Sequence, residues 1–395
     1  MKEIQDIITA WKQLQNDPET AALATLVKVE GSAYRRPGAR MLITSDGQQV
    51  GSISGGCLES DVVVRSQVVI ESGISTLVKY DTTSEDDLIW GLGLGCQGVA
   101  HILIEKLDVD ELNALSVIDK CLSTRVASAV ATVFKTEDMN DLNIGDRILI
   151  DPSGSIVSTI TNLELENIVR RDLQLVLQQQ KSATQVYSLS ESTAEVFLEI
   201  IQPPVSLVIF GAGFDVLPVV RFAKELGWYV TVIDPQARSQ TVERFKECDY
   251  VILGSAERAT LQIEFDGKTV AVAMSHNYLH DLEFLKKLNT ISLKYLGILG
   301  PKKRTNKLLQ DLEYEGCSLP KQLYSPVGLD IGADNPEAIA LSIIAEIQAV
   351  IQNRQGGFLK DRPTSIHSEQ PKALHINGMV KVNGGTWGFG DLGND

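Results

Sequence analysis

The N-terminal half of the chain alternates short β-rich runs with segments of helical periodicity. Apolar residues recur at helical spacing from Ile4 to Leu14, and Asn16-Asp17-Pro18 ends the pattern, so one amphipathic helix is expected there. The pattern then predicts strands at 22–29, 39–44 and 49–54, a helix at 57–73 and a strand at 76–80. This order is typical of a mixed α+β domain.

A duplication underlies this order. Shifting the chain by 107 positions brings Ala24 onto Ala131, Arg40 onto Arg147 and Tyr80 onto Tyr187 without a gap. Roughly a third of the positions in this overlay are identical. Residues 1–202 are therefore predicted to form one domain of two pseudo-symmetric copies, at about 21–106 and 126–202.

The two copies differ at two places. Gly55-Gly56-Cys57, at a strand-to-helix turn of copy one, is replaced by Asn162-Leu163-Glu164 in copy two. A glycine-rich insertion with Gly93, Gly95 and Cys96 has no full-length counterpart, because the equivalent connection in copy two is about a dozen residues shorter. The second copy lacks both features, so functional residues are expected in the first copy.

Strands alternate with helices from Pro203-Pro204 onward, as in a parallel sheet that is covered on both faces. The last helix is expected to begin at Asn335-Pro336, since asparagine caps helices and proline favours their first position. Residues 203–355 are therefore predicted to form a Rossmann-like, doubly wound α/β domain. The tail, 356–395, is polar and then glycine-rich, and it is expected to be a loop or linker.

The composition and the net charge count against several classes of function. The hydrophobic content of 44% and the charged content of 22% are typical of a globular protein, and the net charge of −15 disfavours nucleic acids and anionic membrane surfaces as partners. No run approaches the roughly 18 to 20 apolar residues of a membrane helix, and the start lacks a signal-peptide pattern, so a cytoplasmic protein is expected. Five cysteines without a C-x-x-C pair indicate neither a disulfide framework nor a metal site.

Cys57 follows two glycines and precedes a helical run, so its sulfur is expected at a helix N-terminus. Unpaired N–H groups and the helix dipole stabilise an anion there, which would make the thiol acidic. Such a thiol fits a nucleophile, a sulfur carrier or a neighbour of a bound phosphate. A small residue buried at a tight turn is the alternative, and the loss of the triplet from copy two leaves both interpretations open.

Cys96 lies among alternate glycines, which let a backbone approach a ligand closely. A flexible crossover between strands is the alternative, but the shorter connection in copy two favours a ligand-site loop. The other cysteines, Cys121, Cys248 and Cys317, have no such setting and are expected to pack in the interior.

Three arginines crowd into residues 34–40 of an otherwise acidic protein. A guanidinium is a natural partner of a phosphate. Arg40 has an arginine counterpart in copy two and is expected to be structural, so an anion-binding role would belong to Arg35 and Arg36. A solvated loop with ordinary surface ion pairs is an equally good interpretation.

The second domain carries part of a dinucleotide-binding pattern. Gly211 and Gly213 follow a strand and open a helix, and Asp234 ends the next strand about twenty residues later. Two details count against binding: Val216 stands at the third glycine position, and Asp215 puts a carboxylate where a pyrophosphate would lie. If a dinucleotide binds, Asp234 favours NAD over NADP.

Further polar residues are expected at the carboxyl edge of the parallel sheet, where ligands of such folds collect. His276 and Asn277 follow one strand, Gly300-Pro301-Lys302-Lys303-Arg304 begins a helix after the next strand, and Asp330 lies in a glycine-flanked turn. Each of these residue types is also common in turns, but together they are expected to line a cleft. His276 and His280 are spaced as a pair of metal ligands on a helix would be, but the sequence offers no third ligand, so a metal site is not expected there.

Six ordered blocks resemble the xanthine dehydrogenase accessory factor (XdhC/CoxI-like) family over nearly residues 10 to 357. The blocks are residues 38–62, 90–98, 207–235, 274–282, 296–304 and 325–347. The chain departs from the family pattern at Ala33-Tyr34-Arg35-Arg36, where many relatives have a Ser-Pro-Arg type turn, and in the tail beyond Gly357.

The resemblance implies a maturation factor for molybdenum hydroxylases such as xanthine or CO dehydrogenase. A factor of this family binds molybdenum cofactor (molybdopterin), keeps it while a cysteine desulfurase supplies the terminal sulfur, and passes it to the apo-enzyme. It also implies that Cys57 and Cys96 belong to the cofactor site. We expect a homodimer, because a partner copy would add walls around a large cofactor.

The alternative function is that of an NAD(P)-dependent oxidoreductase, in which the Rossmann-like domain binds the nicotinamide cofactor and His276 is the acid-base group. Val216 and Asp215 count against this alternative. The sequence assigns no catalytic residue to the first function.

Overall fold

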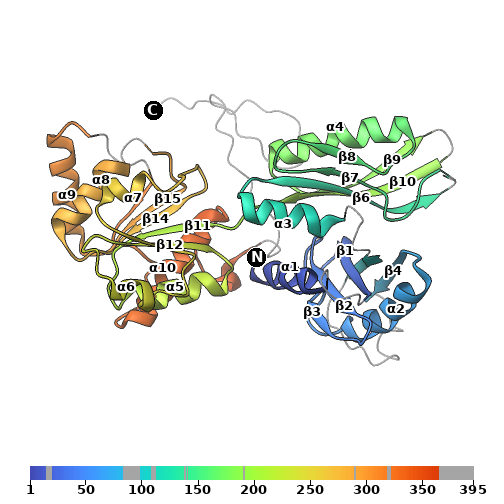
Figure 1. Ribbon diagram of the computed structural model, residues 1–395, viewed down its shortest axis with the longest axis horizontal. Helices are drawn as coiled ribbons and strands as arrows, with labels where there is room; N and C mark the ends of the chain where they lie inside the picture. Colours follow the sequence, from blue (N-terminus) through green and yellow to red (C-terminus); the bar gives the residue numbers. More distant parts are fainter. Residues whose placement is uncertain are drawn as a thin grey trace, which may run out of the picture.

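The computed structural model describes residues 1–14, 20–82, 98–107, 113–137, 139, 141–189, 192–288, 291–317 and 322–363. Two five-stranded sheets lie in the N-terminal half, and a six-stranded sheet forms the C-terminal half (Figure 1). Most of the tail lies outside the described residues, whose last element is the short 3-10 helix Leu359–Asp361. The predicted fold classes are confirmed for both halves.

The first sheet contains β1 (Ala21–Gly31), β2 (Arg40–Thr44), β3 (Gln49–Gly51), β4 (Thr76–Asp81) and β5 (Gly98–Leu107). The strands lie in the order β3-β2-β1-β5-β4, and all neighbouring pairs are antiparallel. Helix α2 (Glu59–Ser72) covers one face, where Val62 and Val69 join the core of alternate strand residues. The helix begins at Glu59 rather than at Cys57, because Leu58 is its N-cap.

The second sheet repeats the first, which confirms the duplication. Its elements are β6 (Ser128–Glu137), β7 (Arg147–Ile150), β8 (Ile156–Ser158), α4 (Leu163–Gln179), β9 (Ala183–Leu189) and β10 (Ser192–Ile201). The strand order, β8-β7-β6-β10-β9, matches that of the first sheet. Even the irregularity recurs, since the register shifts at Val27 in copy one and at its counterpart Phe134 in copy two.

Each copy also has a preceding helix that the repeat comparison missed. Helix α1 (Lys2–Leu14) precedes β1, and helix α3 (Ala114–Thr124) precedes β6. Ile8 and Trp11 of α1 share one buried cluster with Leu115 and Ile118 of α3, which are their counterparts under the same shift of 107. The repeating unit is therefore helix, three strands, helix and two strands.

The two sheets face each other, and α2 and α4 lie on the outer sides (Figure 1). Val27, Leu103, Phe134 and Phe197 form a cluster between the sheets, two from each copy at equivalent positions. A symmetric arrangement of this kind resembles the interface of a homodimer fused into one chain.

Two ion pairs cross this interface in reciprocal fashion, and the first of them is buried while the second is partly buried. Arg40 of copy one binds Glu199 of copy two, with Nη1 donating to Oε1 over 2.8 Å and Nη2 bound to Oε2. Arg147 of copy two binds Glu105 of copy one. Gly38 makes room, since a Cβ there would lie 2.8 Å from Oε1 of Glu199. The predicted structural role of Arg40 is thus confirmed.

The C-terminal sheet contains β11 (Ser206–Phe210), β12 (Tyr229–Asp234), β13 (Tyr250–Leu253), β14 (Val270–Ala273), β15 (Tyr295–Ile298) and β16 (Leu323–Tyr324). All pairs are parallel, in the order β13-β12-β11-β14-β15-β16, which is the Rossmann order. The crevice of such a sheet lies where the order reverses, between β11 and β14.

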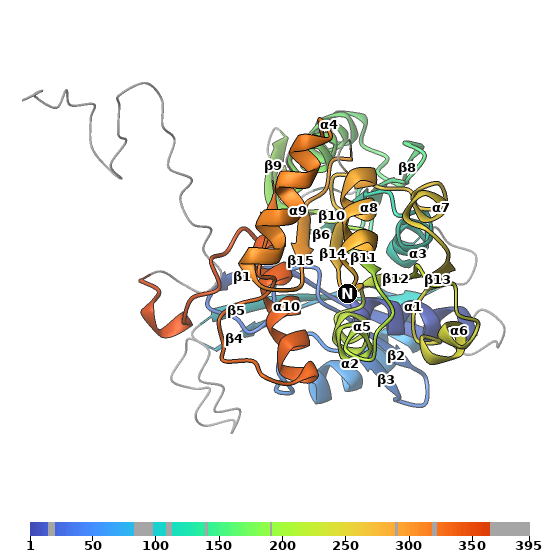
Figure 2. The same cartoon turned by 90° about the vertical axis from the view of Figure 1, so that its left-hand side faces the viewer.

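Helices cover both faces of this sheet, as Figures 1 and 2 show. One face packs on α5 (Val216–Glu225) and α10 (Pro336–Ile351). The other packs on α7 (Ala256–Thr260), α8 (Tyr278–Leu288) and α9 (Lys302–Tyr314). The short helix α6 (Gln240–Arg244) follows β12. Lys2 joins the domains by an ion pair to Glu225, 2.7 Å from Nζ to Oε2.

Candidate functional site

The predicted cofactor residues gather at one edge of the first sheet. In the antiparallel order, β1, β3 and β4 end at the same edge where β2 and β5 begin. The loop with Arg35 and Arg36 joins β1 to β2 at this edge, and the turn with Cys57 follows β3 there. The segment with Gly93, Gly95 and Cys96 lies outside the described residues, but both its ends, Thr82 and Gly98, are at this edge.

A buried glutamate fixes the turn before α2. Glu59 is 8% exposed, and its Oε1 accepts hydrogen bonds from the Ser52 hydroxyl and the Ser54 N–H, both at 2.8 Å. Its Oε2 binds the Ser54 hydroxyl and the Leu58 N–H. Burial acts to raise the pKa of Glu59, but the hydrogen bonds from Ser54 and Ser52 outweigh it and hold the pKa at about 2.

The Ser54 hydroxyl also organises the glycine-cysteine turn. Its oxygen accepts from the N–H groups of Gly56, Cys57 and Leu58 at 3.1 to 3.2 Å. These three N–H groups are therefore not unpaired, contrary to the expectation for the Cys57 setting. The turn leaves Gly55, Gly56 and Cys57 exposed, so the interpretation of Cys57 as a buried packing residue is wrong.

Copy two uses different chemistry at the equivalent place. There Asn162 caps α4 directly, and its Oδ1 accepts from the Leu165 N–H at 3.0 Å. The N-cap residue of α2 is Leu58, whose side chain makes no capping hydrogen bond. The exposed turn of copy one is thus a replacement for a side-chain cap, and the scaffold of copy two forms without it. Sequence comparison missed Glu59, because its counterpart Glu166 is the same residue and only differences between copies were informative.

We expect the Glu59 network to make stability depend on acid pH. An ordinary glutamate titrates near 4.5, and the folded-state pKa of Glu59 is lower, about 2. Its stabilisation, about 3 kcal/mol, is complete above pH 4.5 and is lost as the pH falls towards 2. Urea unfolding across this range should show the loss in the wild type and little of it in Glu59→Gln, with the exposed Glu71→Gln as control. If Glu59→Gln loses as much unfolding free energy at acid pH as the wild type, this role of Glu59 is refuted.

The other cysteines pack as predicted. Cys121 is fully buried, and burial raises its pKa to about 11. Cys248 is half-buried beside the core of the Rossmann-like domain, and burial raises its pKa to about 12. Cys317 is half-buried and packs against the core on the other face of the C-terminal sheet. Among the four cysteines that the structure describes, Cys57 alone is exposed.

The arginines near this edge are already engaged. Arg35 forms a bidentate ion pair with Glu3 of α1, with Nη1 donating to Oε1 over 3.2 Å. Arg36 is exposed. An anion at this edge would therefore share Arg35 with Glu3.

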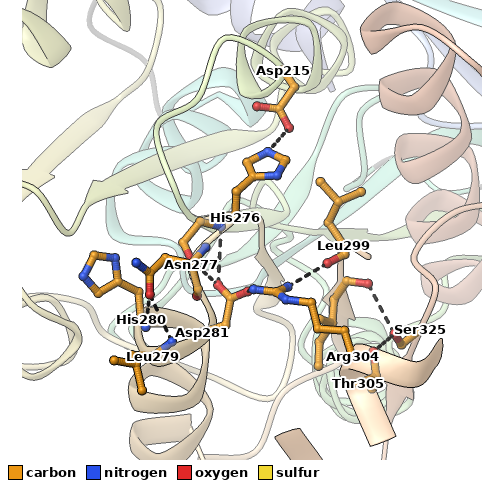
Figure 3. Close-up of polar contacts among 12 residues, drawn as sticks. Asp215, His276, Asn277, Leu279, His280, Asp281, Leu299, Arg304, Thr305 and Ser325 are labelled. Carbon is orange, nitrogen blue, oxygen red and sulfur yellow. Dashed lines mark hydrogen bonds and ion pairs between the residues drawn. The ribbon is translucent and has the colours of Figure 1, made fainter. Parts of the chain in front are cut away.

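The Rossmann-like domain brings a second group of predicted residues together. His276 Nε2 lies 2.7 Å from Oδ2 of Asp215, so the ends of β14 and the β11–α5 loop meet across the crevice (Figure 3). The Asp215 carboxylate lies over the glycine loop, since a Cβ at Gly213 would be 2.3 Å from Oδ1. His276 has a φ of +56°, which is rare for a side-chain-bearing residue, and its side chain is 61% exposed.

A buried network holds the turn that presents His276. Asp281 is fully buried, and its carboxylate binds the Ser275 N–H and hydroxyl and, at 2.7 Å, Nη2 of Arg304. Arg304 in turn donates to the Leu299 carbonyl, 3.1 Å away (Figure 3). Asn277 caps α8, with Oδ1 accepting from the N–H of Leu279 at 3.0 Å. Asn277 therefore has a structural role.

Both carboxylate oxygens of Asp234 already accept hydrogen bonds from the protein, so they are not open to a ribose hydroxyl. The side chain is fully buried and binds the Gln236 N–H at 3.0 Å, the Arg238 guanidinium and the Thr241 hydroxyl at 2.6 Å. Burial acts to raise its pKa, but these bonds lower it overall. Asp330 lies exposed in the loop after β16. The structure thus joins Asp215 and His276 into one pair but gives Asp234 a structural role.

NAD is expected to bind weakly, because the Asp215 carboxylate covers the place of a pyrophosphate. Like charges at such a distance cost about 1.4 kcal/mol or more, so Asp215→Asn should tighten NAD binding about ten-fold. Calorimetric titration would measure this, with Asp6→Asn, an exposed position in the N-terminal domain, as control. Low-micromolar binding by the wild type, unchanged in Asp215→Asn, would contradict this prediction and favour a dehydrogenase.

The part of the chain that the structure describes has no cluster of three His, Cys, Asp or Glu residues that could hold a metal ion. No helix in that part is long and apolar enough to cross a membrane.

Family models match both halves of the chain. The model described as "XdhC and CoxI family" matches twice, at residues 14–81 and 121–188, and the two matches are offset by the 107 positions of the duplication. The model described as "XdhC Rossmann domain" matches residues 207–347.

Relatives extend over most of the chain. A protein of Bacillus subtilis, described as a probable xanthine dehydrogenase subunit, is 35% identical over 87% of this chain and 96% of its own. The molybdenum cofactor insertion chaperone PaoD of Escherichia coli is 23% identical over 84% of this chain and 83% of its own. A crystal structure of a xanthine dehydrogenase from Bacillus halodurans superposes with a TM-score of 0.72 at 30% identity, over 90% of this chain and 98% of that one. With these matches in both halves, the chain belongs to the XdhC and CoxI family.

Proposed function

We propose that this protein binds molybdenum cofactor and delivers it to a molybdenum hydroxylase of the xanthine dehydrogenase type. The observation that carries the proposal is the exposed Gly55-Gly56-Cys57 turn, which the hydrogen bonds of Ser54 and Glu59 hold in copy one and which copy two lacks. The names of the relatives, a molybdenum cofactor insertion chaperone and a probable xanthine dehydrogenase subunit, support the same cargo and recipient.

The cargo would lie at the edge of the first sheet that carries both the Cys57 turn and the ends of the 83–97 segment. An exposed thiol can approach the molybdenum–dithiolene end of the cargo or accept sulfur, whereas the fully buried Cys121 cannot. We propose that Cys57 and Cys96 would contact the cargo during its sulfuration, for which a cysteine desulfurase would supply the sulfur. Gly93 and Gly95 are proposed to contact the cargo as well, because glycines let a backbone approach a ligand closely.

Reconstitution tests this function directly. The protein, purified from a host that makes molybdenum cofactor, is mixed with a cofactor-free xanthine dehydrogenase, and xanthine oxidation is followed. We expect activity to rise with added protein, and further when a cysteine desulfurase and cysteine are present during loading. No gain over a protein-free control that contains the same free cofactor would reject the delivery function.

We also propose that the protein acts in the cytoplasm as a homodimer. Val64 and Val68 are 65% and 62% exposed on the outer side of α2, which leaves an apolar stripe available for a partner. Sedimentation velocity at micromolar concentration should give the dimer mass, and Val64→Asp with Val68→Asp should lower it. A monomeric wild type would reject the dimer.

A further inference from the structure

An exposed tyrosine packs on the turn that carries Cys57. A Cβ on Gly55 would be 3.5, 3.6 and 3.7 Å from Cδ1, Cγ and Cε1 of Tyr34, so Gly55 lies over the face of the ring. The Tyr34 side chain is nevertheless 70% exposed. An aromatic ring with so much surface in solvent can stabilise a bound planar group by stacking on it.

The loop that presents Tyr34 is held before and after the ring. Strand β1 pairs with β5 up to Gly31, three residues before Tyr34. Arg35, which follows Tyr34 directly, forms the bidentate ion pair with Glu3 of α1. Because the fold already holds this loop, binding a ligand there has a smaller ordering cost.

Copy two makes the equivalent contact with hydrogen bonds instead of a ring. Under the shift of 107, the counterparts of Tyr34 and Gly55 are Asp141 and Asn162. The Asn162 side chain donates from Nδ2 to Oδ2 of Asp141 over 3.1 Å, and the Thr161 hydroxyl donates to the Asp141 carbonyl. The scaffold therefore joins the loop to the turn in both copies, but copy two does so without an aromatic side chain.

The ring also adjoins open space and the proposed cargo edge. Tyr34 is among the residues that line a cavity between α1 and α3. Cys57, which is exposed, follows Gly55 by two residues. A planar group that stacks on Tyr34 therefore lies beside the turn that presents the thiol.

We propose that Tyr34 stacks on the planar pterin of the cargo and holds this heterocyclic end beside the Cys57 turn. The inference rests on the proposed function and adds a contact for the pterin, whereas Cys57 is proposed to contact the sulfur-bearing end. Stacking requires the aromatic ring but not the hydroxyl group. Phenylalanine should therefore replace Tyr34, and alanine should not.

Titration of the full chain with 6-hydroxymethylpterin, followed by the fluorescence of the pterin, tests the stack. Tyr34→Ala should weaken binding about ten-fold relative to the wild type, and Tyr34→Phe should stay within about two-fold of it. Tyr34→Asp combined with Gly55→Asn, which introduces the polar pair of copy two, should weaken binding as much as Tyr34→Ala. The control Tyr314→Ala removes a ring of α9 that is 93% exposed, and it should bind like the wild type.

Three results would overturn the stack: equal affinities of the wild type and Tyr34→Ala, equal losses in Tyr34→Phe and Tyr34→Ala, or no binding of the probe by the wild type. Molybdenum retention by the same preparations tests the proposed function separately. If the wild type retains molybdenum and Tyr34→Ala binds the probe normally, the proposed function stands and the stack is rejected. If Tyr34→Ala loses the probe and the wild type never retains molybdenum, the pterin contact stands and the proposed function is rejected.

Discussion

Replacing Arg40 by methionine is expected to destabilise the N-terminal domain by about 3 to 5 kcal/mol. Arg40 is 5% exposed and Glu199 is 7% exposed, so the variant leaves a buried carboxylate without its counter-charge. The pair also joins the two copies, so its loss should loosen the interface between the sheets. Urea unfolding of the full chain measures the change in free energy.

Three further variants separate this explanation from a general effect of losing an arginine. Arg147→Met should cost nearly as much, because Arg147 binds Glu105 at the reciprocal position. Arg40→Met combined with Glu199→Leu should recover most of the loss, since no charge then remains unpaired. Arg65→Met, which breaks a surface pair with Asp61, should cost less than about 1 kcal/mol. An equal cost for Arg65→Met and Arg40→Met would contradict the interface role.

Replacing Cys57 or Cys96 by alanine should lower the molybdenum retained after purification about ten-fold. The two thiols are proposed to contact the cargo, whereas the fold does not depend on the exposed Cys57. Molybdenum analysis of the purified variants measures retention, and circular dichroism verifies that they fold. Cys248→Ala is the matched control, because Cys248 is half-buried and burial raises its pKa to about 12. Retention at the wild-type level in both variants would exclude the thiols from the site.

Periodicity predicted the architecture well, since the elements of all three sheets follow local patterns. The ungapped overlay of the copies predicted the same succession of strands and helix twice, and alternating strands and helices predicted the parallel sheet. The helices α1 and α3 escaped the overlay, because their apolar positions match in character but not in identity, as with Trp11 and Ile118.

Partners distant in sequence could not be predicted. Arg40 was expected to be structural from its counterpart, but nothing local identifies Glu199 as its partner. Asp215 was expected to repel a pyrophosphate, whereas the structure also pairs it with His276 across the crevice. Asp234 stands at the motif position of a ribose-binding carboxylate, but a fold-specific set of donors, including Thr241, already surrounds it.

A cavity of about 450 Å³ between the two copies was also beyond the sequence. Arg35 and Arg36, the anion-binding candidates, line it together with Ile118 and Leu122 of α3, which lie far along the chain. A space between two elements depends on how they pack, and only the structure gives that packing.

The central claim is that this chain holds molybdenum cofactor. The most direct test is to purify the full chain from a host that makes the cofactor and to measure molybdenum by mass spectrometry and pterin by fluorescence after oxidation. We predict molybdenum and pterin in equal amounts, and far above the level in the same protein from a host that cannot make the cofactor. Molybdenum and pterin at the same background level in both preparations would contradict the claim.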